Sequence, residues 1–477
     1  MHAATDVLIV GAGPTGLVLA CELARRGVPY RLVDAGDGPF PGSRGKGLQP
    51  RTLEIFEDLG ILDAVLASGH RLPLMSAWQD GRQVGEWDMM TRTEPTPDAP
   101  FGEPWLLPQW RTQEILRRRL EELGGSVEFG TRLTGFEQDG TGVTARFDGG
   151  GTIRAAYLVG ADGGRSTVRA ALGTPFTGAT VDPAPMIVAD LEVPGLARTH
   201  WHTWNLPEGA LALCPLPRTT AFQLLAGYAT GEPDPSPAGV RALVAARTGL
   251  TAETVHWSSV FRARAAMAER FRTGRVFLAG DAAHVHSPAG AQGLNTSIQD
   301  AYNLGWKLAH ALRRGGDDAL LDSYEAERLP VAAGVLGLST RIHRAGGDGG
   351  RPMMGRRGKE AHQLDLNYRE SPLSWEARSG LADGALRAGD RAPDGVTDDG
   401  GRLFEVFRGT RFTLLAVGRH GELPQVDGDL VRAHALDEAP AYGHGLFVIR
   451  PDGYVGLATQ EPGDVEKYLR TAAGAAA

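Results

Sequence analysis

The chain has 477 residues, of which 42% are hydrophobic and 22% charged, and its formal net charge is −8. This length predicts two or three domains, and the acidic balance excludes a basic surface for nucleic acid or for an acidic membrane. The two cysteines, Cys21 and Cys214, lie far apart in apolar segments, which indicates buried thiols in a reducing compartment and no disulfide framework. Residues 1–5 lack the features of a signal peptide and no apolar run reaches membrane length, so we expect a soluble, cytoplasmic protein with no membrane partner.

The first motif occupies residues 6–16, with the sequence DVLIVGAGPTG. Its four apolar residues predict a buried parallel strand, and the apolar run after the glycines predicts a helix. Gly11 then permits the tight turn, Gly13 lets the backbone approach a pyrophosphate, and Gly16 lets helix and strand pack closely. The N–H groups and the dipole at the helix N-terminus would hold the anion.

A second strand ends at Asp34, 18 residues beyond Gly16, where a carboxylate that binds a ribose hydroxyl is expected. The start of the chain therefore predicts a dinucleotide-binding βαβ unit, and a βαβ unit without a ligand is the less favoured alternative. The following loop, rich in glycine and proline, carries Arg44, which either clamps a phosphate or is a solvated surface charge.

The middle of the chain alternates between two kinds of pattern. Residues 72–108 are irregular and rich in proline and tryptophan, which predicts an excursion out of the nucleotide-binding fold. A helix near residue 111 and short alternating strands return to that fold and end in GADGGRS, residues 160–166. From 174 to 270, alternating segments between proline and glycine turns predict an antiparallel sheet with one covered face, as in a second domain inserted into the first.

A third strand-end motif begins at Gly280 and Asp281, in GDAAHVHSPAGAQGLNTSIQDAYNLGWKLA, and a long helix is expected from about residue 295. His284 and His286 form an HxH pair, but apart from Asp281 no further ligand lies near them in the sequence. We therefore predict no metal site and interpret the pair as part of a binding loop.

These three motifs, in this order, resemble those of the flavin-dependent aromatic hydroxylases of the p-hydroxybenzoate hydroxylase-like class, over about residues 1–345. The length and the tail further resemble the subgroup that acts on polycyclic aromatic polyketides and rifamycin-type antibiotics. The resemblance implies an α/β fold: a Rossmann-like FAD-binding domain, an inserted antiparallel β-sheet substrate domain and a C-terminal thioredoxin-like module. The FAD-binding domain is expected over 1–71, 109–173 and 271–345, the substrate domain over 72–108 and 174–270, a linker over 346–383, and the module over 384–477.

The resemblance also assigns residues to the cofactor. The pyrophosphate is expected beside Thr15, and the adenosine ribose on Asp34 with its neighbour Ala35. The backbone of the strand that holds Leu133 would flank the adenine, and Arg44 would reach the cofactor from its loop. The complete set of expected FAD-binding residues is Gly11, Gly13, Thr15, Gly16, Asp34, Ala35, Arg44, Gln109, Leu133, Asp162, Asp281, Gly293, Leu294 and Asn295.

At the flavin end, the resemblance implies oxygen chemistry. Asp162 would help to bind both FAD and NAD(P)H, and Gln109 would contact the flavin region. Pro288 and Gly290 would leave room beside flavin C4a, where oxygen adds to give a hydroperoxide, and no side-chain base is assigned. Backbone N–H groups of residues 294 and 295, at the start of a helix, would stabilise the anionic reduced flavin.

The expected activity is NAD(P)H-consuming hydroxylation by O2 of a bulky aromatic, polyketide-type natural product. Alternatives are modification of a rifamycin-like antibiotic, Baeyer–Villiger oxygen insertion, and a flavoprotein that binds aromatic ligands without turnover. The tryptophans between residues 78 and 257 either line a flat pocket or belong to the core. The substrate, the choice of NADH or NADPH, a homodimer and the role of the cysteine-free C-terminal module stay open.

Overall fold

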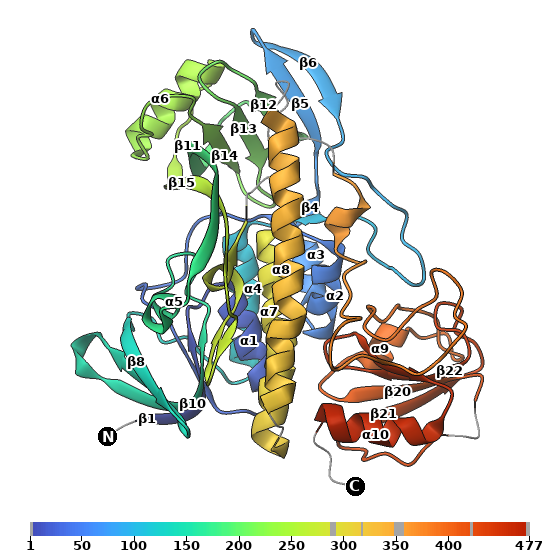
Figure 1. Ribbon diagram of the computed structural model, residues 1–477. Coiled ribbons are helices and arrows are strands. Elements are labelled where there is room, and N and C mark those ends of the chain that lie inside the picture. Colours follow the sequence, from blue (N-terminus) through green and yellow to red (C-terminus); the bar gives the residue numbers. More distant parts are fainter. Residues whose placement is uncertain (1–2, 287–291, 316–317, 348–356, 420–422, 474–477) are drawn as a thin grey trace.

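The computed structural model describes residues 3–286, 292–315, 318–347, 357–419 and 423–473. Figure 1 shows three parts: a part that contains β1 and α1, a sheet domain above it that carries α6, and a C-terminal module around β20. The first is here called the nucleotide-binding part, after the prediction from its sequence. The helix α8 (Asp318–Gly347) runs between the nucleotide-binding part and the C-terminal module. Among the described residues, no helix combines the length and the apolar character needed to cross a membrane.

A seven-stranded sheet forms the centre of the nucleotide-binding part. Its main path is β16 (Arg272–Thr273), β17 (Val276–Leu278), β10 (Thr152–Gly160), β1 (Ala3–Val10) and β2 (Tyr30–Val33). The hairpin of β8 (Leu133–Asp139) and β9 (Gly142–Phe147) adds to β10. Because β17, β10, β1 and β2 are parallel, the residues that follow them meet at one edge of the sheet.

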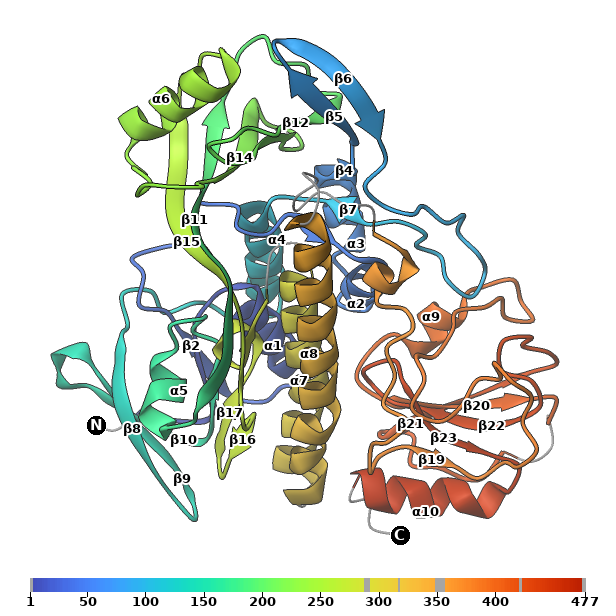
Figure 2. The same ribbon diagram turned by 45° about the horizontal axis from the view of Figure 1, so that its top comes forward.

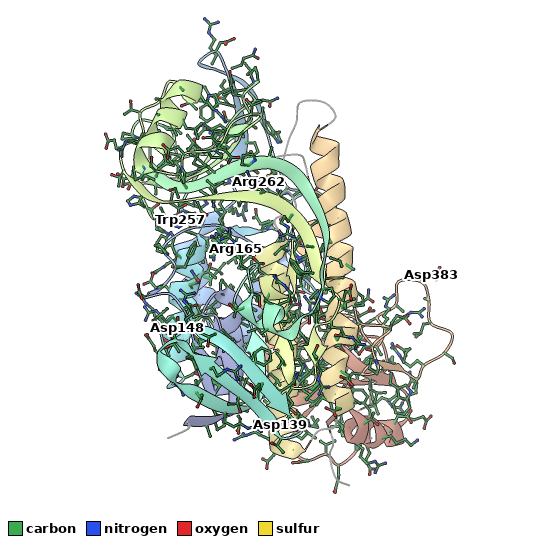
Figure 3. The ribbon with its side chains drawn as sticks, turned by 60° about the vertical axis from the view of Figure 1, so that its left-hand side comes forward. Asp139, Asp148, Arg165, Trp257, Arg262 and Asp383 are labelled. Carbon is green, nitrogen blue, oxygen red and sulfur yellow. The ribbon has the colours of Figure 1, made fainter. Side chains whose placement is uncertain are left out.

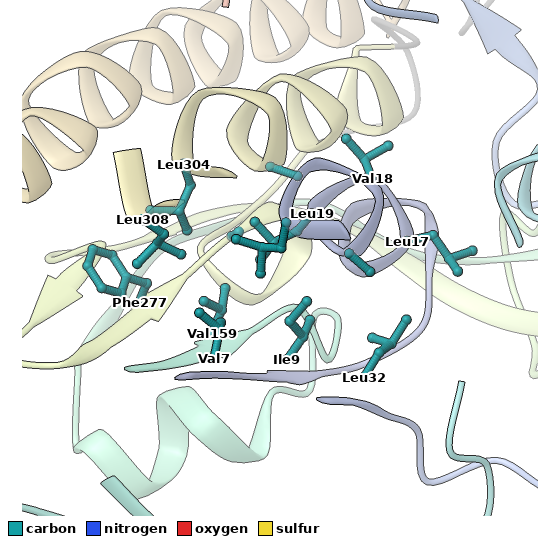
Figure 4. Packing of buried hydrophobic residues seen from close by; sticks show 14 of the residues in the cluster. Val7, Ile9, Leu17, Val18, Leu19, Leu32, Val159, Phe277, Leu304 and Leu308 are labelled. Atoms are coloured by element: carbon teal, nitrogen blue, oxygen red, sulfur yellow. The ribbon is translucent and has the colours of Figure 1, made fainter. Parts of the chain in front are cut away.

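Helices cover this sheet and complete its core. The principal ones are α1 (Pro14–Ala24), α4 (Gln109–Glu122) and α7 (Gly293–Arg314). Figure 4 shows Leu19 of α1 and Leu304 of α7 packed above the strand residues Val7 and Val159. The helices α1 and α7 approach closely at Gly305, where a Cβ atom would lie 2.5 Å from Glu22 Cβ. Burial of each large aliphatic side chain here contributes about 1.5–3 kcal/mol.

Shorter elements complete this part of the chain. The remaining helices are α2 (Pro50–Asp58), α3 (Leu62–Ser68) and α5 (Thr167–Leu172). A small sheet consists of β3 (Gly47–Leu48), β7 (Trp105–Leu106) and β4 (His70–Arg71). It ties the loop after β2 to the segment that precedes α4.

The upper domain is an eight-stranded sheet, and β5 and β6 from residues 72–108 join it. In order, its strands are β18 (His284–Val285), β15 (Val255–Ala268), β11 (Phe176–Glu192), β14 (Ala221–Gly227), β13 (Leu211–Pro215), β12 (His200–Trp204), β5 (Leu74–Gln79) and β6 (Arg82–Trp87). All pairs are antiparallel except β12 with β5, a strand that comes from a distant part of the chain. The long strands β11 and β15 connect this sheet to the nucleotide-binding part (Figure 2).

The two faces of the upper sheet have different partners. On one face, residues such as Ala189 and Leu191 form a core with α6 (Pro237–Thr248). Strand alternation places Asp190 on the other face, in a cross-strand row with Trp257 and Gln223. This second face is directed toward the loop of residues 40–46, because Gln223 Nε2 donates to the carbonyl of Ser43.

The C-terminal module has its own five-stranded sheet. Its strands are β19 (Trp375–Glu376), β23 (Val455–Thr459), β22 (Gly445–Ile449), β20 (Phe412–Val417) and β21 (Val431–Leu436). Two helices accompany the sheet, α9 (Leu403–Phe407) and α10 (Pro462–Ala473). The module docks on α7 and α8 through buried charges, since Arg450 pairs with Glu327 at 2.6 Å.

The expected linker, residues 346–383, contains a packed connection in its described part. The N–H of Thr91 donates to the carbonyl of Arg357 at 2.9 Å, and Gln299 Nε2 donates to Gln363 Oε1 at 2.7 Å. Residues 357–363 therefore join the segment of residues 72–108 to helix α7. The sequence pattern of this segment did not predict the connection, because its hydrogen bonds are made largely by backbone and side-chain amide groups.

Candidate cofactor site

The edge of the nucleotide-binding sheet brings the three sequence motifs into contact. At Gly11 (φ +107°), a Cβ atom would lie 2.3 Å from the carbonyl oxygen of Ala161 and 2.9 Å from Asp162 Cα. At Gly280 (φ +62°), it would lie 2.5 Å from Thr15 Oγ1. The first motif thus touches the second and the third, and both contacts require glycine.

The first turn of α1 is suited to a diphosphate. The helix begins after Gly13, and no side chain caps its N-terminus. A Cβ atom at Gly13 would meet no protein atom within 4 Å, so this backbone is open to an approaching ligand. The first N–H groups of a helix have no acceptor within it, and together with the helix dipole they favour an anion.

Asp34 braces this turn from the end of β2. Its Oδ2 accepts the N–H of Ala12 at 2.7 Å, and its Oδ1 accepts the N–H of Gly36 at 2.8 Å. A carboxylate has about four lone-pair sites, so a ribose hydroxyl could still donate to it. The adjacent Ala35 is exposed, whereas the side chain of Leu133 at the start of β8 is buried in the core.

Asp162 is engaged by its own loop. Its Oδ1 accepts the hydroxyl of Ser166 at 2.5 Å and its Oδ2 accepts the N–H of Thr167 at 2.7 Å, so the carboxylate caps α5. Burial raises the pKa of Asp162, and these hydrogen bonds oppose the rise. The structure therefore gives Asp162 a role in shaping the turn beside Gly11, in addition to the expected one toward cofactors.

Asp281 follows β17 and is exposed, although Gly280 and Ala282 beside it are buried. Surrounding protein atoms raise the pKa of its carboxyl, and the charges of His284 and Arg44 oppose this rise. Among the described residues, no protein group donates a hydrogen bond to the Asp281 carboxyl. An open carboxylate at a strand end suits the hydroxyl groups of a ribityl or ribose chain.

Arg44 lies between this edge and the upper domain. Its guanidinium carbon is 5.2 Å from the ring centroid of Phe40 and 6.0 Å from that of Trp257. Figure 3 shows Trp257 in the upper domain and Arg165 of the nucleotide-binding part below it. The side chain of Arg44 is exposed. Its charge acts on the Asp281 carboxyl, and its guanidinium lies near Trp257 of the upper sheet.

The start of α7 is the second helix N-terminus in the site. It begins at Gly293 without a side-chain cap, and a Cβ atom on Gly45 would lie 3.2 Å from the Leu294 side chain. Gln109 Oε1 holds the same loop by accepting the N–H of Gly45 at 3.1 Å. Asn295 uses its side chain for the fold: its Nδ2 donates to the carbonyl of Gly47 at 2.9 Å. Pro288 and Gly290, expected at the flavin, lie outside the described residues.

Known proteins share these features along the chain. The model of a family described as an FAD binding domain matches residues 4–339. The chain belongs to this family. A flavin-dependent monooxygenase of Mycobacteroides abscessus is 44% identical over 97% of this chain and 99% of its own length, and a rifampicin monooxygenase of Rhodococcus hoagii is 33% identical over 98% of each. A solved ternary complex of aklavinone-11 hydroxylase with FAD and aklavinone is 30% identical over 100% of both chains, with a TM-score of 0.79.

This FAD-binding chain is thus an oxidoreductase of the flavin-dependent monooxygenase type, and its residues fit the cofactor. An uncapped helix and an open Gly13 would meet the diphosphate, Asp281 offers an open acceptor, and α7 offers a second uncapped helix. No group of at least three histidine, cysteine or acidic side chains that could hold a metal is found in the described part of the chain.

A buried charge cluster beneath the FAD site was missed by sequence reasoning. His284 Nε2 donates to Asp300 Oδ2 at 2.6 Å, and Arg328 Nε donates to Asp300 Oδ1 at 2.7 Å. The N–H of Gly280 also donates to Asp300, at 3.0 Å. Burial alone would raise the pKa of Asp300, but the charges of His284 and Arg328 lower it to about 2. The available signal was an acidic residue on the apolar face of an amphipathic helix.

Proposed function

We propose that this FAD-dependent enzyme consumes NAD(P)H and O2 to hydroxylate a bulky aromatic substrate of the polyketide type. One observation carries the proposal: residues 43–46 contact both the start of α7 and the inner face of the upper sheet. Gly45 packs against Leu294, while Lys46 lies over Trp201 with its Nζ 4.2 Å from the ring centroid. A flavin held at α7 would therefore act directly beside an aromatic-lined sheet.

The residues present would have separate roles in binding FAD and the substrate. The α1 turn at Gly11–Gly16 would hold the diphosphate, and Asp281 a hydroxyl-bearing chain of FAD. When bound, FAD supplies hydride acceptance and oxygen activation, chemistry that no side chain offers. The N–H groups of residues 293–295 would stabilise negative charge at the pyrimidine edge through the α7 dipole. Trp257 and Trp201 would orient a flat substrate by stacking.

We further propose that Pro288 and Gly290 form the flavin C4a environment and that the C-terminal module is thioredoxin-like. The second proposal is supported by the strand order β21, β20, β22, β23, with a parallel pair, an antiparallel hairpin and a final helix. The solved aklavinone-11 hydroxylase reported above supports an aromatic polyketide as the class of substrate.

The decisive experiment combines coenzyme oxidation with product mass. Holoenzyme is supplied with NADPH or NADH, O2 and a panel of anthraquinone, naphthacene and ansamycin compounds. We expect at least one compound to stimulate coenzyme oxidation about tenfold or more and to gain one oxygen atom by mass. A yellow protein that binds these compounds yet never oxidises coenzyme above its ligand-free rate contradicts the proposal.

A second candidate is modification of a rifamycin-type antibiotic, and it rests on the 33% identical rifampicin monooxygenase, matched over 98% of both chains. The same assay separates the two candidates. Rifampicin that gains one oxygen atom, while the polycyclic polyketides stay unchanged, would favour the second. Oxidation of the polyketides alone would favour the first.

A further inference from the structure

Two cations near the upper sheet, the buried Arg357 and the partly buried Lys46, have no carboxylate at ion-pair distance among the described residues. Arg357 is only 4% exposed, and its Nε atom is buried without a hydrogen-bond partner. Within the described ranges its guanidinium forms no ion pair, and burial alone lowers the pKa of Arg357 to about 10. A buried cation without a counter-ion is costly, so an unpaired one points to a ligand that supplies negative charge.

Lys46 is the second cation. Its ammonium donates to Gln223 Oε1 and lies over the Trp201 ring. Burial lowers the pKa of Lys46, Cys214 and the charge of Asp190 oppose this shift, and the charge of Arg357 adds to it, so the two cations act on one another. No carboxylate of the described chain lies within ion-pair distance of this ammonium.

Both cations border one apolar group of side chains, here called the methionine cluster. Its buried members are Leu72, Met75, Met89, Met90, Leu106, Trp201, Ala212, Cys214 and Ala361. Lys46 covers Trp201 of this cluster, while the N–H of Arg357 donates to the carbonyl of Met89 at 2.8 Å. Because these side chains are buried, a large aromatic body would have to displace some of them, and methionine is an adaptable side chain that repacks readily.

The methionine cluster adjoins the helix that would hold the flavin. The carbonyl of Ala361 accepts Gln292 Nε2 at 3.1 Å, immediately before α7. Lys46 follows Gly45, which packs against Leu294 in the first turn of that helix. A ligand between the two cations would therefore lie at the reaction site and would be the aromatic substrate itself.

One nearby acid does not balance the charge. Asp190 is 3% exposed, and neither of its carboxylate oxygens has a partner with hydrogen-bond geometry. Burial raises the pKa of Asp190 to about 6, although Ser43 and the charges of Lys46 and His256 oppose the rise. Even with Asp190 ionised, Lys46 and Arg357 leave one positive charge uncompensated.

We propose that Lys46 and Arg357 form an anion-binding subsite that receives an ionised oxygen of the aromatic substrate, either a carboxylate or an acidic phenolate or enolate. The proposal rests on the proposed function and names a chemical feature of its substrate. Arg357 offers a planar fork of donors and Lys46 a point charge, which together suit a delocalised oxyanion.

The test uses three flat probes of one ring system. Anthraquinone-2-carboxylate and alizarin, which is ionised at pH 8, carry the two kinds of oxyanion, and 2-(hydroxymethyl)anthraquinone is neutral. Each is titrated into FAD-loaded wild-type, Lys46→Met and Arg357→Met enzyme while flavin absorption is followed. We expect each substitution to weaken the binding of at least one anionic probe by about tenfold to a hundredfold. Binding of the neutral probe should weaken by less than about twofold. The anionic probe that wild type prefers identifies the oxyanion.

Matched variants keep the test sharp. Lys359→Met removes an exposed cation close to Arg357 in sequence and should change no affinity. Arg357→Lys and Lys46→Arg keep the charge and should retain most of the anionic preference, even where a methionine variant fails to hold FAD. Equal losses for all three probes, or no preference of wild type for either anion, would overturn the subsite. Product formation without anionic preference refutes the subsite alone, whereas anionic preference without coenzyme oxidation refutes only the proposed function.

Discussion

Gly11 and Gly13 lie in the same turn but are restricted by different neighbours. Gly11 has a φ of +107°, and a side chain there would collide with the carbonyl of Ala161. Gly13 has open space on its Cα, so the folded protein alone would accept a methyl group. A diphosphate seated on the turn, as proposed, would give Gly13 a reason to lack a side chain.

The substitution Gly13→Ala should therefore leave folding intact and weaken FAD binding by about tenfold or more, since the methyl group would meet the diphosphate. Gly11→Ala should lower the stability of the apoprotein itself by about 1–3 kcal/mol. Apoprotein unfolding and FAD titration by fluorescence measure the two effects separately. Gly38→Ala, also with open space at its Cα, is the control. Wild-type FAD affinity in Gly13→Ala would contradict the proposed seat of the diphosphate.

The backbone geometry of the glycine turns was the most predictable part of the proposed site. The spacing of the glycines and their place after a strand determine their geometry, and the structure brings all three motifs to one edge. Side-chain roles were less predictable, because Asp162 caps a helix and Asn295 bonds to Gly47 through contacts that only the fold creates. Lys46 and Arg357 could not be paired from the sequence, since a backbone bridge at Met90 brings Arg357 to the cluster.

Among the elements, α7 links the FAD site to the rest of the molecule. Hydrogen bonds to Asp300 fix its first turns: the carboxylate accepts from His284 at 2.6 Å and from Arg328 at 2.7 Å. Arg328 Nη2 also donates to the carbonyl of Thr296 at 3.0 Å. The helix start that would face the flavin is therefore fixed by a carboxylate two turns into the helix.

Asp300→Asn should cost about 3–5 kcal/mol and reduce FAD retention, because it leaves Arg328 as a buried, uncompensated charge. The pKa of Asp300 is about 2, below its ordinary value, so its stabilisation is complete above about pH 4 and is lost as the pH falls toward 2. The stability difference between wild type and variant should narrow over the same interval in denaturant titrations. Asp322→Asn removes an ion pair in which the acid is 68% exposed and should change stability by less than about 1 kcal/mol. A variant as stable as wild type at pH 7 would show that the cluster does not support α7.

Periodicity in the sequence predicted the positions of the helices and strands better than it predicted which strands pair. A helix expected from about residue 295 begins at Gly293, and the strands that end at Val33 and Leu278 belong to the parallel sheet. The parallel pairing of β12 with β5 had no local signal, because alternation gives a strand its faces but not its neighbour.

At the scale of the whole molecule, the C-terminal module is attached by ionic contacts that are fully buried. Glu327 of α8 accepts from Lys307 of α7 and from Arg450 of the module, both at 2.6 Å. Arg450 also pairs with Asp452 at 2.5 Å. Burial would raise the pKa of Glu327, but the charges of Arg450 and Lys307 lower it below its ordinary range. The cluster therefore depends on all of its members being present.

Arg450→Met should cost about 3–5 kcal/mol, because it leaves Glu327 and Asp452 buried with only Lys307 to compensate them. Since α7 belongs to both the cluster and the FAD site, the loss should lower the temperature of FAD release together with that of global unfolding. Flavin fluorescence and circular dichroism, recorded on one heating ramp, measure the two temperatures. Arg470→Met breaks an exposed pair on α10 and should leave both unchanged within about 1 kcal/mol of stability. If Arg450→Met instead unfolds in two steps, with FAD retained after the first, the module is an independent unit and its docking does not support the FAD site.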